Sequence, residues 1–109
     1  MNARAKIWVE KEGKPVFGDG RYALLKAISS EGSINKGARK LGMAYKQAWD
    51  EINLMEKRFG MKLLRRRKGG VRGGGAELTE HALSLLGRYE RFRDKATVAI
   101  NAAFRDVFE

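Results

Sequence analysis

The sequence of 109 residues contains no cysteine and a single histidine. The absence of cysteine excludes disulfides, thiolate metal sites and cysteine nucleophiles, and it fits a reducing cytoplasm. His81, the only histidine, has no metal-ligand partner in the sequence around it. No serine belongs to a histidine–acid constellation that would activate it as a nucleophile. We therefore expect a protein that is not an enzyme, with no catalytic residue, no metal and no cofactor.

Long apolar runs are also missing. No segment approaches the roughly 20 apolar residues of a membrane span, and residues 1–13 lack the apolar run of a signal peptide. The glycine-rich segment 69–75 does not lead into a Walker loop, which needs a lysine and a hydroxyl after its last glycine. Here Gly74 is followed by Gly75 and Ala76. The expectation is a cytoplasmic protein that does not associate with a membrane and does not hydrolyse nucleotides.

Acidic residues are few, with 13 Asp and Glu against 23 Lys and Arg, and the net charge is +10. Such an excess informs about partners rather than fold, and it favours a polyanion: DNA first, then RNA, then an acidic membrane surface. A solvated basic surface is the alternative, so the positions of the charges decide. The length predicts one domain. Because so small a core is only modestly stable alone, dimerisation would help it.

The N-terminal part of the sequence predicts a small β-hairpin and a helix. Two short β-like runs lie between residues 4 and 17, and Ile7 and Val9 share the face that is expected to pack on a core. Asp19 is predicted to cap a helix over 21–30. The apolar side of that helix is expected to contain Leu24, Leu25 and Ile28.

Residues 33–56 then predict a short helix, a tight turn and a longer helix. Ser33 is expected to cap the short helix, and Gly42 supplies a left-handed residue in the turn. The longer helix is expected over about 44–58. Its buried face is predicted from apolar spacings of three and four, at Ala48, Ile52, Met55 and Phe59.

The last third of the sequence predicts a basic hairpin and a long helix. A strand that begins at Leu63 runs into a glycine-rich tip over 69–75, and a short return strand leads to Thr79, the cap of the final helix. That helix would run to about Val107, roughly 40 Å. Its coiled-coil-like stripe, which a small domain cannot bury alone, comprises Leu85, Tyr89, Phe92, Ala96, Ala99 and Ala103.

A helix-turn-helix followed by a basic, glycine-tipped hairpin is typical of winged-helix DNA-binding domains. We therefore predict a mainly α (α+β) fold: a winged helix-turn-helix with a short N-terminal β-hairpin and a long C-terminal dimerisation helix. The DNA-binding domain is expected to span residues 1–78 and the dimerisation helix residues 79–109. The expected partners are double-stranded DNA and a second copy of the chain.

The start of the longer helix carries side chains suited to reading DNA. The major groove admits an α-helix, and side chains near its N-terminus reach the base edges. Lys46 suits a phosphate or a guanine, Gln47 an adenine, and Tyr45 a phosphate or a thymine methyl. Asn53, one turn further on, can reach the backbone or a base. For Trp49, packing and DNA contact remain equally open.

Two further groups flank this helix. Asp50 would be repelled by phosphates, so it either accepts from a cytosine amine or is neutralised by Lys46, and the second role is favoured. On the short helix, Ser33 is expected to act as a cap whose neighbouring amides touch a phosphate. Lys36 is a candidate phosphate contact, because this helix crosses the backbone in the motif.

The basic hairpin has the densest positive charge in the sequence. Successive side chains of a strand point to opposite faces, so Arg65 and Arg67 are expected to differ in role from Arg66. Glycines let the tip lie close to a sugar–phosphate wall, and the arginine within the tip would enter a minor groove. The candidate DNA contacts here are Arg65, Arg66, Arg67, Lys68 and Arg72.

The fragments GSI, AYKQAWDEIN and GGGAELT resemble the N-terminal winged-helix domain of the ModE-type molybdate-responsive regulators, which are distantly related to the LysR-type DNA-binding domain. The resemblance covers about residues 20–90, and the segment 45–53 is its most discriminating part. It implies dimerisation through the long helix and operator binding through the third helix and the wing. Regulators of this type carry molybdate-binding modules after this domain, so no molybdate site is expected within the 109 residues.

Three hypotheses follow for function. The first is a dimeric, sequence-specific transcriptional regulator. The second is a sequence-neutral architectural DNA-binding protein, which needs only phosphate contacts and deformable DNA. The third is an adaptor that binds proteins through the long helix, with DNA binding secondary. RNA binding ranks lower, because the sequence has no aromatic strand pair of the kind that stacks on bases.

Overall fold

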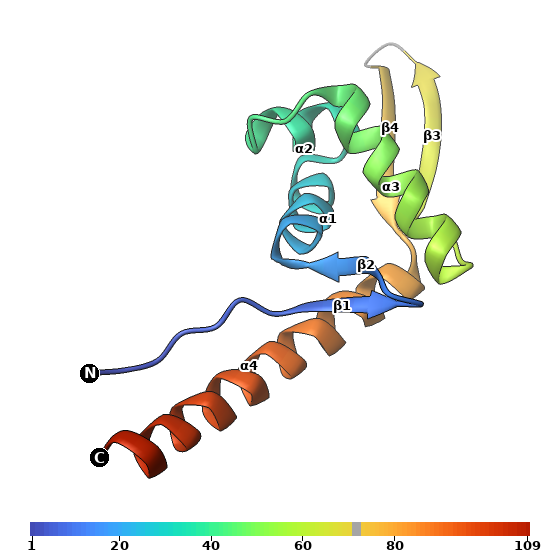
Figure 1. The fold of residues 1–109 in the computed structure, drawn as a ribbon. Helices are drawn as coiled ribbons and strands as arrows, with labels where there is room; N and C mark the ends of the chain where they lie inside the picture. The colour runs from blue at the N-terminus through green and yellow to red at the C-terminus, as the bar shows by residue number, and fades with distance from the viewer. Residues whose placement is uncertain (71–72) are drawn as a thin grey trace.

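The computed structural model describes residues 1–70 and 73–109, and its extents are 61 × 28 × 22 Å. A compact body of three helices and two hairpins lies against the first part of one long helix (Figure 1). The elements are β1 (Trp8–Lys11), β2 (Lys14–Gly18), α1 (Asp19–Glu31), α2 (Ile34–Lys40), α3 (Tyr45–Phe59), β3 (Leu64–Gly70), β4 (Gly73–Leu78) and α4 (Glu80–Phe108). Both sheets are antiparallel pairs, β1 with β2 and β3 with β4. The predicted winged helix-turn-helix fold is confirmed.

One hydrophobic core joins β2, the helices and the strands β3 and β4, which form the hairpin called the wing below. The predicted buried faces of α1 and α3 are confirmed, because six of the seven side chains named for them are completely buried. The seventh, Phe59, is partly buried at the edge of the core. Each large aliphatic side chain in such a core contributes about 1.5–3 kcal/mol through burial. The largest fully buried side chains are Val16, Phe17, Leu24, Leu25, Ile28, Ile52, Met55 and Leu63.

Two predicted helix caps and one predicted turn are also confirmed. Ser33 Oγ accepts from the amide of Lys36 at 3.1 Å and caps α2, while Thr79 Oγ1 accepts from the amide of Ala82 at 3.2 Å and caps α4. Gly42 turns the chain between α2 and α3 with φ of 67°, where a Cβ would be strained. These short-range signals place the two helices of the motif.

Two expectations for the N-terminal part are wrong. β1 is exposed along its whole length, and the hairpin contributes to the core through Val16 and Phe17 of β2 instead of Ile7 and Val9. Asp19 does not cap α1, because the helix already begins there and its cap residue is Gly18, without a side-chain bond. The carboxylate of Asp19 instead accepts a hydrogen bond from α4.

The wing is longer than predicted. β3 continues to Gly70 and β4 begins at Gly73, so all five glycines of the expected glycine-rich tip lie in strands. The amide of Ala76 in β4 donates to the carbonyl of Gly32 at the end of α1, at 2.8 Å. A Cβ on Gly75 would lie 3.2 Å from that same carbonyl oxygen. The base of the wing is therefore packed against the turn that leads into α2.

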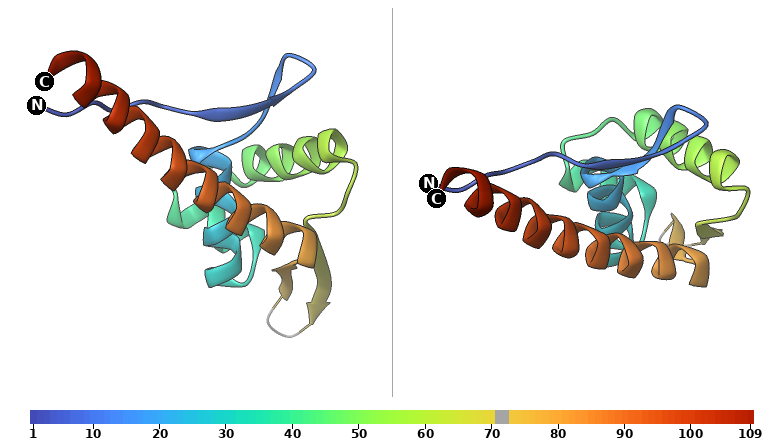
Figure 2. Two further views of the ribbon diagram at one scale, coloured as in Figure 1. Left: turned by 90° about the horizontal axis from the view of Figure 1, so that it is seen from below. Right: turned by 60° about the horizontal axis from the view of Figure 1, so that its bottom comes forward.

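The long helix α4 divides into two parts. Its first part packs on the body through Ala82, Leu86 and Tyr89, which are buried. Its second part extends away from the body, with the N-terminal segment of the chain running beside it (Figure 2). Within the described residues, no helix combines the length and apolarity that crossing a bilayer requires.

Gly37 is where α2 comes closest to α1. A Cβ built there would lie 2.8 Å from the backbone nitrogen of Ile28, so the two helices would have to separate. We predict that Gly37→Ala destabilises the protein by about 1–3 kcal/mol, the range for overpacking a core. Gly20→Ala is the matched control, because a Cβ at this α1 position meets open space. Urea unfolding of both variants tests the prediction, which fails if they are equally stable.

Candidate nucleic-acid interface

The first two turns of α3 present polar and aromatic side chains to solvent. Ala48 and Ile52 are fully buried, so the opposite side of the helix is exposed. Tyr45 is 51% exposed, and Lys46 and Gln47 are also exposed. No side chain caps the N-terminus of α3, so its first amides are left for another acceptor. This surface, residues 45–53 on the outer side of α3, is called the reading face below.

Lys46 and Asp50 form an ion pair on the reading face. Lys46 Nζ lies 2.9 Å from Asp50 Oδ2, at the spacing of four residues that places side chains on one side of a helix. Both side chains remain largely exposed, so the pair adds little to stability. The pair neutralises the charge of Asp50. It also restrains the Lys46 side chain on the first turn of α3. This geometry agrees with the role favoured for Asp50 from the sequence, which is neutralisation by Lys46.

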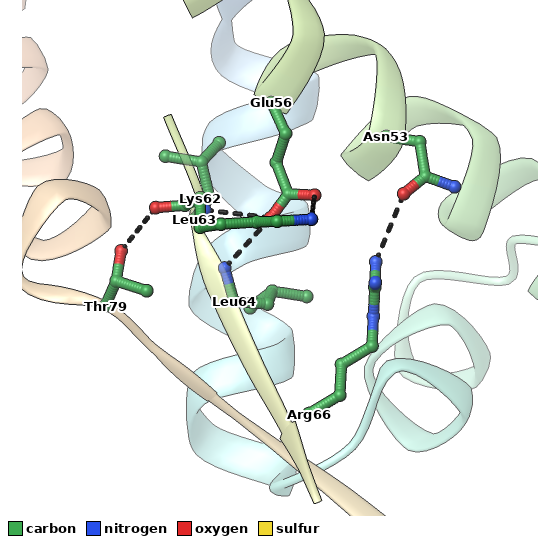
Figure 3. A network of polar contacts seen from close by, with 7 residues as sticks. All are labelled: Asn53, Glu56, Lys62, Leu63, Leu64, Arg66 and Thr79. Atoms are coloured by element: carbon green, nitrogen blue, oxygen red, sulfur yellow. Dashed lines mark hydrogen bonds and ion pairs between the residues drawn. The ribbon is translucent and has the colours of Figure 1, made fainter. Parts of the chain in front are cut away.

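Arg66 of β3 joins the wing to the reading face. Its guanidinium lies 5.5 Å from the centre of the Trp49 ring and donates to Asn53 Oδ1 at 3.3 Å (Figure 3). Trp49 is 41% exposed, so its ring is neither in the core nor free. Of the two roles open from the sequence, packing and DNA contact, the structure favours packing, because the Trp49 ring lies beneath Arg66. The Asn53 amide is oriented by the same contact, with its oxygen occupied.

A cleft of about 580 Å³ lies between α2, the start of α3 and the wing. The cleft brings together predicted site residues from three separate elements, and its positive side chains come from both helix and hairpin. Its sides are formed in part by Ser33, Lys36, Arg39, Tyr45, Arg66 and Arg67. A cationic cleft that opens beside an exposed helix N-terminus suits a phosphate backbone.

The other wing residues differ from this arrangement. Arg65 Nε lies 3.3 Å from Glu77 Oε1, its cross-strand partner, so its charge is paired on the surface. Lys68 lies on β3, but its side chain is outside what the structure describes, and Arg72 lies outside the described residues altogether. Arg67 is thus grouped with Arg66, since both line the cleft, and not with Arg65 as expected from the alternation along the strand.

Glu56, which the sequence analysis did not single out, fixes the connection between α3 and the wing. This carboxylate is buried and accepts from the backbone amides of Leu63, at 2.9 Å, and Leu64, at 3.3 Å. On the other side of the strand, Thr79 Oγ1 donates to the carbonyl of Lys62 at 2.8 Å (Figure 3). Glu56 thus links the end of α3 to the start of β3 through two backbone hydrogen bonds.

A second cluster that the sequence did not reveal joins α1 to α4. Tyr89 donates to Asp19 Oδ1 at 2.7 Å, Tyr22 donates to Glu90, and Arg93 lies 3.4 Å from Asp19 Oδ1. Burial, and then the bond to Asp19, raises the pKa of Tyr89 to about 12, and the bond to Glu90 raises the pKa of Tyr22. Burial opposes the charge of Arg93, but bonds to Asp19 and Tyr22 outweigh it and raise its pKa. All three keep their protons at neutral pH.

No group of three or more metal-ligating side chains occurs in the part of the chain that the structure describes. The chemistry available at this surface is therefore that of hydrogen bonds, positive charge and aromatic faces. Such groups recognise a polyanion and its bases.

Comparison with known proteins agrees with this geometry. The model of the family described as bacterial regulatory helix-turn-helix protein, lysR family, matches residues 21–83. Among solved structures, the CbnR_DBD–DNA complex gives a TM-score of 0.60 at 20% identity and covers 80% of this chain and 94% of that one. At this identity the likeness concerns the fold alone.

Curated relatives share more of the sequence. The DNA-binding transcriptional dual regulator ModE of Escherichia coli K12 is 38% identical over 90 residues, which are 83% of this chain and 34% of that protein. The transcriptional regulator ModE of Yersinia pestis is 46% identical over 70 residues, 64% of this chain and 27% of that protein. The molybdenum-pterin-binding protein MopA of Rhodobacter capsulatus is 32% identical over 96 residues, 88% and 36% of the two chains. The chain thus spans about a third of the length of these relatives.

Proposed function

Since the chain belongs to the lysR family of bacterial regulatory helix-turn-helix proteins, we propose that it is a sequence-specific DNA-binding transcriptional regulator of the ModE-like kind. It binds operator DNA as a dimer, with the reading face in the major groove and the wing against the sugar–phosphate backbone. It acts in the cytoplasm, and its partners are double-stranded DNA and a second copy of the chain. The DNA-binding domain is residues 1–78 and the dimerisation helix is residues 79–109.

The single observation that carries this proposal is the placement of the cationic cleft beside the reading face. Tyr45 belongs to both surfaces. A duplex that placed its backbone in the cleft would therefore present its adjacent groove to the exposed side of α3. Backbone contacts fix the register of a protein on DNA, and base contacts read the sequence. In the cleft, Lys36 and Arg67 contact the DNA backbone. On the reading face, residues 45–53 contact the bases.

Dimerisation is supported by the second part of α4. The predicted stripe is buried where α4 meets the body, at Tyr89, but Phe92 is 47% exposed and Ala99 and Ala103 are exposed. An apolar stripe that repeats in steps of three and four and continues past the body is suited to a matching helix. A two-fold dimer places two reading faces on one side of the duplex, as palindromic operators require.

Molybdate sensing is not part of the proposal. The MopA and Azotobacter vinelandii relatives, whose names refer to molybdenum, are about three times as long as the matched region, and the matched region is the part proposed to bind DNA. We propose no oxyanion site among the described residues.

Selection of bound sequences from random duplexes tests the proposal. We expect an enriched inverted repeat whose half-sites lie about 34 Å apart, one helical turn, or a multiple of it. The architectural alternative predicts strong binding without any enriched motif, because it depends only on phosphates and DNA deformability. The adaptor alternative predicts weak DNA binding that survives neither competitor DNA nor moderate salt.

Lys46→Ala is expected to weaken binding mainly on the selected sequence. One well-placed contact to a base discriminates by about 1–3 kcal/mol, so affinity for the selected site should fall about 10- to 100-fold. Affinity for unrelated duplexes should fall much less. Titration by fluorescence anisotropy at fixed salt measures both affinities.

Lys57→Ala is the matched control, because it removes the same charge from an exposed position in the last turn of α3. It should change both affinities little. Equal losses for the two variants on both kinds of DNA would show that Lys46 contributes only general charge.

A further inference from the structure

The contacts between α1 and α4 go beyond what packing two helices requires. Asp19 and Tyr22 lie in the first turns of α1, and Tyr89, Glu90 and Arg93 lie in the middle of α4. These five residues are called the joint below. Its two hydrogen bonds and its ion pair connect residues about 70 positions apart in the sequence.

The joint is anchored in the core and fixes α4 from more than one direction. The ring of Tyr89 is edge-on to Phe17, with centroids 5.1 Å apart, and its hydroxyl donates to Asp19. The guanidinium of Arg93 lies 4.9 Å from the centre of the Tyr22 ring and 5.6 Å from that of Tyr89. Arg93 therefore contacts both rings and the carboxylate of Asp19, so a tilt of α4 would disrupt several contacts together.

Because the joint lies in the middle of α4, a small tilt there produces a large displacement at the end of the helix. Residues 94–108 of α4 follow Arg93, roughly 22 Å of helix. A tilt of about 10° at the joint would displace the far end of this segment by about 4 Å, close to the ~3.4 Å rise of one base pair along a strand. In a dimer joined along α4, the same tilt moves each reading face relative to its partner.

We propose that the joint, with Arg93 as its main positioning residue, sets the separation of the two reading faces and thereby restricts the dimer to operators of one half-site spacing. This inference rests on the proposed function, because it presupposes a dimer that binds paired half-sites. The joint itself touches no DNA. It acts by holding the direction in which α4 leaves the body.

The test compares spacing selectivity between two arginine variants of the full chain. Arg93→Met keeps an unbranched side chain but removes the guanidinium from both rings and from Asp19. Arg91→Met removes the same charge from an exposed position on the same helix. Affinities are measured for the selected operator, for versions with one to three base pairs inserted between the half-sites, and for a single half-site. Thermal unfolding is recorded for each protein.

We expect the unaltered chain and Arg91→Met to lose about 100-fold in affinity when two base pairs are inserted, because both half-sites can no longer be bound together. Arg93→Met should lose less than about tenfold over the same change while its affinity for a single half-site stays within about twofold. Tyr89→Phe removes one hydrogen bond and keeps the ring, so its loss of affinity on the same insertion should lie between those of Arg91→Met and Arg93→Met. This variant serves as the test if Arg93→Met does not fold.

Three outcomes would overturn the inference. One is an Arg93→Met spacing profile that matches that of Arg91→Met, accompanied by an unchanged profile for Tyr89→Phe. Another is a parallel loss of single half-site affinity, which would assign Arg93 to the DNA surface or to stability alone. The third is binding by the unaltered chain to a specific half-site without regard to spacing. Failure of sequence-specific DNA binding is distinguishable from all three, since it would appear as the absence of any sequence preference, and failure of dimerisation alone would appear as a monomer in sedimentation.

Discussion

Ala99→Glu should convert the proposed dimer to a monomer and reduce affinity for paired half-sites by about 100-fold or more, the gain that linking two binding modules supplies. Ala99 is exposed on the stripe of α4, beyond the part that packs on the body. Two copies of the substituted helix would place like charges at the seam, without the small side chain that lets helices approach. Sedimentation measures the oligomeric state, and anisotropy on paired and single half-sites measures the affinity.

Val98→Glu is the control for this variant. Val98 is 68% exposed and lies about 100° around the helix from Ala99, off the predicted stripe. It should leave the dimer intact and its DNA affinity within a few-fold, although it adds the same charge. If Val98→Glu separates the subunits and Ala99→Glu does not, the dimer uses another face of α4.

Glu56→Ala should lower the free energy of unfolding by about 2–4 kcal/mol. The substitution leaves the buried amides of Leu63 and Leu64 without their acceptor, and each unsatisfied donor costs about 1–3 kcal/mol. The ion pair with Lys62 adds little, because the lysine side chain is 77% exposed and the distance is 3.8 Å. Urea unfolding at one fixed protein concentration measures the change, since dimerisation makes stability concentration-dependent.

Two further variants separate the roles of the Glu56 side chain. Glu56→Gln keeps an acceptor oxygen and should lose less stability than Glu56→Ala. Glu77→Ala removes an exposed carboxylate from a surface pair with Arg65 and should change stability by less than about 1 kcal/mol. Equal stability of Glu56→Ala and Glu77→Ala would mean that the connection between α3 and the wing does not depend on the buried acid.

Local and periodic signals made most of the fold predictable from the sequence. The spacing of Ala48, Ile52 and Met55 gave the buried side of α3, and hydroxyl residues one position before the helices gave the caps at Ser33 and Thr79. These signals operate over a few residues, where helix geometry alone decides which side chains meet. The order of elements and the placement of the helix-turn-helix follow from them.

What the sequence did not predict depends on contacts between distant segments. Asp19 has the local features of a helix cap, yet its carboxylate is bound by Tyr89, 70 residues further on. The run of arginines in the wing does not reveal by itself that Arg65 pairs across the sheet while Arg66 turns to Trp49. Glu56 likewise resembles any exposed helix acid until the chain returns and places two amides against it. Such partners are fixed by tertiary packing, and the local patterns of a single sequence do not show which distant segments come together.

The central claim is that two reading faces enter the major groove of one duplex, and tethered cleavage tests it most directly. The sequence has no cysteine, so Gln47→Cys provides a unique attachment point for an iron chelate that cuts nearby DNA. Lys57→Cys, at the opposite end of α3, is the control. We expect two clusters of cuts from position 47, placed symmetrically about the centre of the selected operator, and few from position 57. Cleavage from position 57 in place of 47, or a single asymmetric cluster, would contradict it.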